Sequence, residues 1–166
     1  MTYPPPRYDD PDGTVSARLR PATQRPDLAG PLSSVHYLAT GASTGGDYGL
    51  YRWEMGAAPS GPAAHFHRTI SEAFYVLDGA VRLYDGDHWI TATSGDFLYV
   101  PAGGIHAFRN ESGAPASMLI LFSPGAPREA YFEETAEIVR SGRQLSPEEW
   151  TELYLRHDQY MVEPRS

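Results

Sequence analysis

The chain of 166 residues has a formal net charge of −8 at pH 7, no cysteine, and no lysine, since all thirteen of its basic residues are arginine. This composition excludes disulfides, thiolate metal sites and Schiff-base or P-loop lysines, and the negative charge disfavours binding to nucleic acid or anionic membranes. No stretch reaches the roughly 18 apolar residues of a membrane span, so we expect a cytoplasmic protein without nucleic-acid or membrane partners.

In chain order, the first segment is an arm, residues 1–33, rich in Pro, Asp, Arg and Thr. Such a composition is typical of a segment that drapes over a domain or stays partly disordered. From residue 34 to 124, short apolar runs alternate with turn signals such as Asp78-Gly79, which indicates an all-β sandwich or barrel. The expected strands cover 35–39, 49–55, 72–77, 80–84, 88–92, 97–100, 105–109 and 116–122.

The last segment, residues 125–166, changes to helical patterns. The first expected helix begins at Pro127 and ends before Gly142, a residue that often follows a helix. The second begins with Ser146 as N-cap, and Glu149 completes a capping box. We therefore expect two short helices packed on the β domain. The apolar stripe of the first helix is predicted to contain Phe132, Ala136 and Val139.

Two histidines stand one residue apart in the stretch HFHRTISE. In a strand, His65 and His67 point to the same face, with Phe66 on the other. Glu72 follows after four residues, room enough for a turn, so two imidazoles and one carboxylate can be directed at a single point. A fourth candidate, His106, follows the bend in PAGGIH. This set of side chains suits Fe, Mn, Ni, Cu or Zn rather than Ca or Mg.

These two segments resemble the paired motifs of the cupin superfamily. The first motif is matched in spacing by His65, His67, Glu72 and Gly79. The second is matched by Gly95, Pro101, Gly103, His106 and Asn110. One departure is Pro59, which stands where the family has a glycine. The resemblance implies a cupin-type jelly-roll β-barrel that holds one divalent transition metal, Fe, Ni, Mn, Cu or Zn, by three His and one Glu, with two adjacent coordination positions open.

Aromatic side chains dominate the strand faces that alternation turns toward the inside. This bias favours a flat, apolar or aromatic ligand, and the scarcity of cationic residues on these faces disfavours a multiply charged substrate. The remaining histidines, His36, His88 and His157, have no partner spacing, so we expect them in surface or capping roles. The expected substrate-binding residues are Tyr51, Trp53, Met55, Phe74 and Phe108.

Three functions are compatible with the resemblance, because this superfamily hosts many chemistries. The first is a metal-dependent dioxygenase of the quercetinase type, an oxidoreductase in which Glu72 is the catalytic base toward an aromatic or enediol-like small molecule. The second is a non-redox isomerase, lyase or cyclase that uses the metal as a Lewis acid. The third is a non-enzymatic, metal-containing ligand-binding cupin. We also expect a homodimer, formed through edge strands or the arm.

Overall fold

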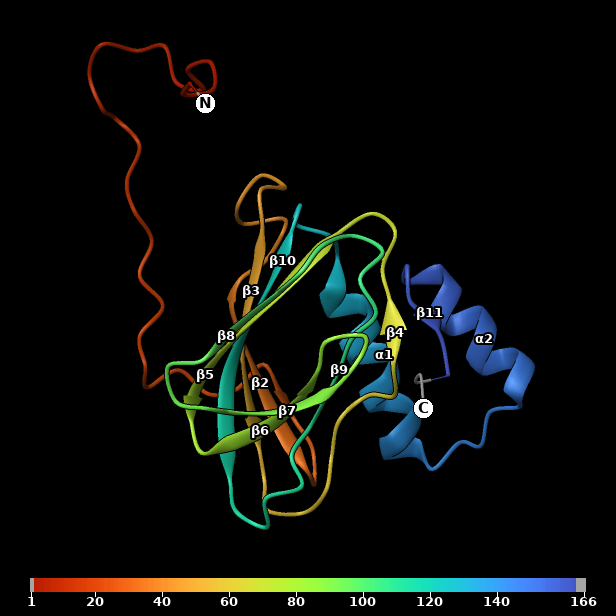
Figure 1. The fold of residues 1–166 in the computed structure, drawn as a ribbon. Coiled ribbons are helices and arrows are strands. Elements are labelled where there is room, and N and C mark those ends of the chain that lie inside the picture. Colours follow the sequence, from red (N-terminus) through yellow and green to blue (C-terminus); the bar gives the residue numbers. More distant parts are fainter. Residues whose placement is uncertain (1, 164–166) are drawn as a thin grey trace.

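The computed structural model describes residues 2–163, and its strands form three sheets (Figure 1). The largest sheet has six strands, all paired antiparallel. In their order across the sheet, they are β1 (Leu28–Ala29), β2 (Ser33–Ala39), β3 (Gly49–Met55), β10 (Ala116–Ser123), β5 (Ser71–Asp78) and β8 (Phe97–Val100).

The two smaller sheets complete the β structure, and all their pairs are also antiparallel. The three-stranded sheet consists of β7 (Trp89–Thr93), β6 (Ala80–Tyr84) and β9 (Ala107–Arg109). The two-stranded sheet consists of β11 (Tyr160–Met161) and β4 (His65–Phe66). Every strand expected between residues 34 and 124 is present within two residues of its predicted bounds. The all-β jelly-roll prediction is confirmed, although the strands in residues 2–163 do not form one closed hydrogen-bonded barrel.

The hydrophobic core lies between the large sheet and the three-stranded sheet. Strand β10 alternates buried and partly buried residues along its whole length, with Met118 and Ile120 on the buried face. Val81 and Leu83 contribute the facing side from β6. Alternation of this kind is what a strand with one face toward a core requires, because successive side chains point to opposite faces.

The turn between β5 and β6 requires glycine. Gly79 has a φ of 75°, in the left-handed region, and a Cβ at this position would lie 2.6 Å from the carbonyl oxygen of Pro115. A turn is present at Asp78-Gly79, but the hairpin expected there is not formed, because β5 pairs with β10 and β8 while β6 pairs with β7 and β9. The turn instead joins the large sheet directly to the three-stranded sheet.

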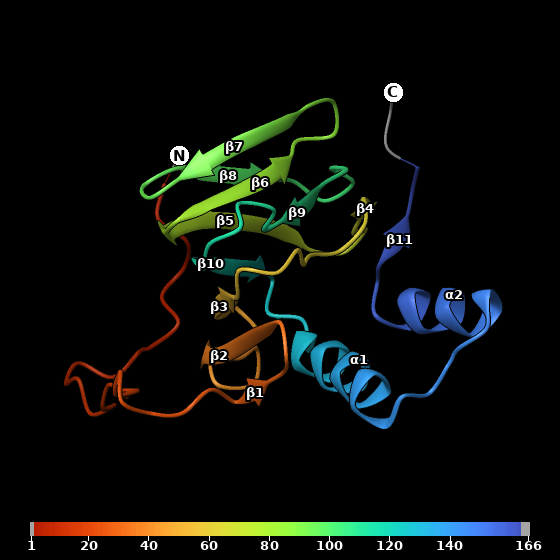
Figure 2. The same cartoon turned by 90° about the horizontal axis from the view of Figure 1, so that it is seen from below.

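Helices α1 (Arg128–Ser141) and α2 (Pro147–Arg156) follow the last long strand (Figure 2). The capping box of α2 is formed as predicted, because the Ser146 hydroxyl accepts from the Glu149 amide and the Glu149 carboxylate accepts from the Ser146 amide. Both helices lie on the side of the sheets where β4 and β11 pair (Figures 1 and 2). Within residues 2–163, no helix combines the length and apolar character that crossing a membrane requires.

Two expectations from the sequence are wrong. The stripe predicted for α1 is shifted, because Phe132 is buried but Ala136 and Val139 are exposed, and Arg128 and Ile138 are buried instead. The buried face of α1 could not be identified from hydrophobicity, because its first buried residue is the charged Arg128. His36, expected at the surface, is 4% exposed on β2, where Nε2 lies 3.2 Å from a carboxylate oxygen of Glu54 and 3.0 Å from a guanidinium nitrogen of Arg52.

The other two histidines lie as expected. His88 has a side chain that is 76% exposed. His157 is the C-cap of α2, and its Nε2 lies 2.8 Å from Glu134. At the start of the chain, residues 2–27 contain no strand or helix, and they extend away from the sheets before Leu28 joins β2 (Figure 1).

Candidate metal centre

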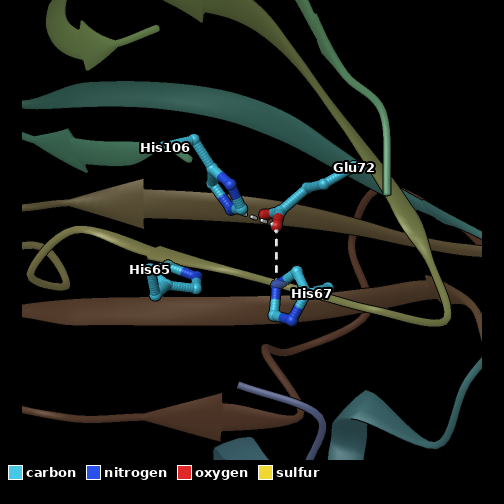
Figure 3. Close-up of side chains that lie close together, drawn as sticks. All are labelled: His65, His67, Glu72 and His106. Atoms are coloured by element: carbon cyan, nitrogen blue, oxygen red, sulfur yellow. Dashed lines mark hydrogen bonds and ion pairs between the residues drawn. The ribbon is translucent and has the colours of Figure 1, made fainter. Parts of the chain in front are cut away.

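The four side chains expected to bind a metal lie together (Figure 3). One ligand atom from each of His65, His67, Glu72 and His106 lies within 4.8 Å of the ligand atoms of the others. None of the four residues is more than 4% exposed. Glu72 Oε2 is 2.8 Å from Nε2 of His106 and 3.2 Å from Nε2 of His67. The cluster is thus a compact, buried set of three imidazoles and one carboxylate.

Backbone pairing explains how two distant motifs meet. His65 and His106 form an antiparallel bridge, in which each amide donates to the carbonyl of the other residue at 3.0 and 2.9 Å. His67 follows two residues later, on the same face as His65. Glu72 enters from β5, where it pairs with Val100 on one side and Phe122 on the other. Three separate backbone segments therefore position the four side chains.

Backbone carbonyl groups orient all three imidazoles. Nδ1 lies 2.8 Å from the carbonyl oxygen of Ala63 for His65, 2.6 Å from that of Asp158 for His67, and 3.0 Å from that of Gly104 for His106. Because a carbonyl oxygen only accepts, Nδ1 must carry the proton, so Nε2 is the nitrogen that can bind a metal. In His67 and His106, Nε2 faces Glu72, and a metal would take the place of that contact. Histidines that bind metals are usually anchored in this way.

The C-terminal segment takes part through Asp158, which has a φ of 54°. Its carboxylate accepts from the amides of Arg68 and Thr69 and from the Thr69 hydroxyl, the last at 2.6 Å. Its carbonyl oxygen accepts from His67, and the pairing of β11 with β4 follows immediately. A residue outside both motifs thus holds the turn after His67.

The electrostatics of the cluster favour a neutral His65 and an ionised Glu72, the forms of these two groups that can bind a metal. Burial, together with the charge of His106, lowers the pKa of His65 to about 3. Burial also disfavours the ionised form of Glu72, but the charge of His106 and the hydrogen bonds from His106 and His67 outweigh it and lower the pKa of this carboxyl. The same partnership raises the pKa of His106 against the effect of burial. A metal bound to Nε2 of His106 would replace the hydrogen bond between this nitrogen and Glu72.

The chemistry of the donor set fits a divalent transition metal. Imidazole nitrogens with one carboxylate are typical ligands of Zn, Fe, Mn, Ni and Cu, whereas Ca and Mg prefer oxygen ligands. The buried carboxylate of Glu72 has His67 and His106 as its hydrogen-bond partners, and a cation would neutralise it in their place. The cluster can hold one metal ion, which His65, His67, Glu72 and His106 would bind.

A cavity of about 230 Å³ borders this cluster, and His65 and Glu72 are part of its lining. Of the five expected substrate-binding residues, Trp53 and Phe108 line it. Tyr51, Met55 and Phe74 do not, because they are packed into the core with exposures of 3% or less. A second hollow, of about 370 Å³, lies between α1 and α2 and is lined by none of the four clustered residues.

The opposite side of the cavity was not identified from the sequence. Arg128, Tyr131, Phe132 and Thr135 line it from α1, and Gln159 lines it from the segment after α2. The four helical residues follow the spacing of one helix face, i, i+3, i+4 and i+7. This spacing could have indicated that the four residues share one helix face. An arginine at the first position of a helix, however, is more often exposed to solvent. Burial lowers the pKa of Arg128, although a guanidinium remains charged in proteins.

Comparisons with known proteins agree with this geometry. The model of the cupin domain family, Cupin_2, matches residues 51–122. Quercetin 2,3-dioxygenase of Bacillus subtilis (strain 168) is 38% identical over 48 residues, which are 29% of this chain and 14% of that protein. The match thus covers a small part of that relative.

Solved structures share the fold. KdgF from Halomonas sp. has a TM-score of 0.60 at 15% identity, covering 69% of this chain and 99% of that one. The polyketide cyclase RemF from Streptomyces resistomycificus has a TM-score of 0.55 at 16% identity, covering 66% and 80%. Ectoine synthase from P. lautus has a TM-score of 0.55 at 16% identity, covering 69% and 80%. The matched family model identifies residues 51–122 as a cupin domain, and the two motifs and the shared fold agree with it.

Proposed function

We propose that the chain is a metal-dependent enzyme that acts on a small, aromatic or enediol-like molecule, as a dioxygenase of the quercetinase type. The observation that carries this proposal is that the His–Glu cluster borders a cavity whose other lining is largely aromatic and aliphatic. The short match to quercetin 2,3-dioxygenase supports the choice of reaction. When bound, a divalent transition metal would supply a Lewis acid and open coordination positions for substrate and dioxygen.

Glu72 is the residue best placed to move a proton. It lines the cavity, it is buried, and His106 and His67 keep it ionised. A general base must reach the proton it removes, and a hydroxyl of a molecule in this cavity would lie next to this carboxylate. His106 and His67, whose Nε2 atoms lie 2.8 and 3.2 Å from Glu72 Oε2, keep the carboxylate oriented.

The aromatic lining selects the shape of the substrate. Trp53 contacts Phe108 edge-to-face, with ring centroids 6.0 Å apart, and contacts Phe132 at 5.2 Å. All three rings line the cavity and can pack against a flat molecule. The volume of about 230 Å³ is below the roughly 300–1,000 Å³ of pockets for drug-sized ligands, which favours a compact substrate.

Metal analysis followed by oxygen uptake tests this function. Protein purified without chelator should contain about one Fe, Ni, Mn or Cu per chain by mass spectrometry. Loaded with that metal, it should consume oxygen with quercetin or with smaller aromatic enediols, and Glu72→Gln should not. Glu54→Gln is the matched control, because Glu54 also faces a histidine, His36, but lies outside the cavity.

Two outcomes would replace this proposal. Turnover of a hydroxy or carbonyl substrate without oxygen, with zinc bound, would indicate an isomerase, lyase or cyclase that uses the same residues. Tight binding of such molecules without turnover would indicate a binding protein. Failure to take up any of these metals on reconstitution would contradict the metal centre itself.

A further inference from the structure

We propose that Arg128 binds a carboxylate group of the substrate, so that the cavity takes small aromatic carboxylates rather than neutral aromatics. This inference names the substrate class of the proposed enzyme, and its reference to a substrate at the metal rests on that proposed function. The sequence interpretation that cationic residues are scarce concerned the inward faces of the strands, and Arg128 comes instead from helix α1.

The first observation is a buried charge without a countercharge in contact. Arg128 is 4% exposed, and within residues 2–163 it makes no ion pair with a carboxylate. Its Nη1 donates to the carbonyl of His157 at 2.7 Å and its Nη2 donates to Gln159 at 3.2 Å, and both acceptors are neutral. Burying a cation is costly unless an anion compensates it.

The second observation is unused hydrogen-bonding capacity. A guanidinium has five N–H donors in a fork that matches a carboxylate. Within residues 2–163, the Nε of Arg128 is buried without a partner, and each Nη group makes one hydrogen bond. The guanidinium therefore has donor capacity that its contacts with the C-terminal segment do not use. A carboxylate that enters the cavity can accept from it.

The third observation is the surroundings of the guanidinium. Its carbon lies 4.6 Å from the ring centre of Tyr131, 5.1 Å from that of Phe122 and 5.7 Å from that of Phe132. These rings hold the guanidinium by cation–π contacts. Burial raises the pKa of Tyr131 to about 12, so this phenol is neutral at pH 7 and supplies no anion.

The fourth observation is the shared cavity. Arg128, His65 and Glu72 all line the space of about 230 Å³, so one small molecule can contact both the cluster and the guanidinium. With a divalent metal in the cluster, the metal would carry two positive charges, Arg128 one positive charge and Glu72 one negative charge. The net charge around the cavity would then be about two positive charges. A substrate with one carboxylate offsets part of this charge, whereas a neutral one offsets none of it.

Calorimetric titration of the full chain loaded with zinc tests this inference without requiring turnover. The probes are 2-hydroxybenzoate and its neutral amide, 2-hydroxybenzamide, which have nearly the same shape. The wild type should bind the carboxylate at least about tenfold more tightly, the effect expected of a charge-assisted hydrogen bond. Arg128→Gln should lose most of that ratio while its zinc content stays at the wild-type level.

Arg109→Gln is the matched control, because Arg109 also stacks on an aromatic ring, 4.6 Å from the centre of Trp89, but lies outside the cavity. This variant should keep the wild-type ratio. Equal binding of the two probes by the wild type, no binding of the carboxylate, or an unchanged ratio in Arg128→Gln would each overturn the inference.

Two further measurements keep the test decisive. If Arg128→Gln does not fold by circular dichroism, Arg128→Lys replaces it; lysine keeps the charge but not the fork, so the ratio should fall only in part, and an unchanged ratio overturns the inference. If the chain takes up no metal, the proposed function fails separately. The titrations with 2-hydroxybenzoate and 2-hydroxybenzamide are then repeated on the metal-free wild type and the metal-free Arg128 variant. The ratio of the two affinities decides the role of Arg128 alone, by the criteria given above.

Discussion

The cavity has two walls that differ in how they are held. The sheet wall consists of strand and loop residues, among them His65, Glu72, Trp53 and Phe108. The helix wall consists of Arg128, Tyr131, Phe132, Thr135 and Gln159. Backbone hydrogen bonds between strands position the sheet wall, for example the reciprocal pair between His65 and His106. Side-chain packing positions the helix wall, since α1 lies against the core through Phe132.

This difference separates two tasks. Metal ligands must converge to within a few tenths of an ångström, and a paired backbone supplies that rigidity. Side chains on a helix packed against the sheets can be substituted to change which substrate is recognised, without moving the metal-binding cluster. We therefore expect changes in the sheet wall to affect metal binding and reaction, and changes in the helix wall to affect which ligand binds. Four substitutions test this division, and their expected effects decrease in order.

His106→Ala should remove most of the bound metal and with it all activity. The change deletes one of the four side chains that would bind the metal and leaves Glu72 without its closer partner, at 2.8 Å. Metal per chain, measured by mass spectrometry after dialysis, provides the test. His88→Ala serves as control, because that side chain is 76% exposed, and it should bind metal like the wild type. A wild-type metal content in His106→Ala would place the metal elsewhere.

Glu72→Gln should lower the turnover rate by about 100- to 10,000-fold, the range typical for loss of a general base, while retaining more metal than His106→Ala. The amide keeps an oxygen near the metal but cannot take up a proton. The rate per bound metal is the quantity to measure. Rates that remain at the wild-type level would show that Glu72 is not the base.

Asp158→Ala should weaken metal binding by about 10- to 100-fold, the usual effect of losing a group that orients a ligand. The change removes the hydrogen bonds to Arg68 and Thr69 that hold the carbonyl anchoring His67. Competition with a chelator measures the affinity. Asp96→Ala is a matched control, because Asp96 similarly accepts from the amide and hydroxyl of Thr93, away from the site. If Asp158→Ala and Asp96→Ala changed the metal affinity equally, the proposed role of Asp158 in orienting His67 would be refuted.

Ser146→Ala should lower the free energy of unfolding by about 1 kcal/mol, as expected for loss of an N-cap, with no change in metal content. The capping box is remote from the metal ligands, so this change tests whether the helical segment can be weakened without disturbing the sheet wall. Urea denaturation measures the effect. Thr151→Ala, an exposed hydroxyl within α2, should change stability less, and a larger effect there would contradict the capping argument.

Much of the sheet wall could be predicted because its signals are local. The period of two in a strand places His65 and His67 on one face, and the paired motifs of the cupin resemblance bring in Glu72 and His106. The same alternation identified Trp53 and Phe108, but it could not separate them from Tyr51 and Phe74, which have the same pattern and are packed in the core. Whether an inward residue borders a void depends on what packs opposite it.

Local patterns were enough to predict the strands and the capped helix α2, because alternation, turn residues and caps act over a few neighbours. The convergence of the two motifs was implied by the resemblance to the cupin superfamily. The position of Arg128 at the cavity and the anchoring of His67 by Asp158 depend on tertiary structure alone. Those contacts join residues tens of positions apart in the sequence. The burial of an arginine is also not predicted by a hydrophobic pattern. Their geometry follows from how the helices dock on the sheets, which no local pattern encodes.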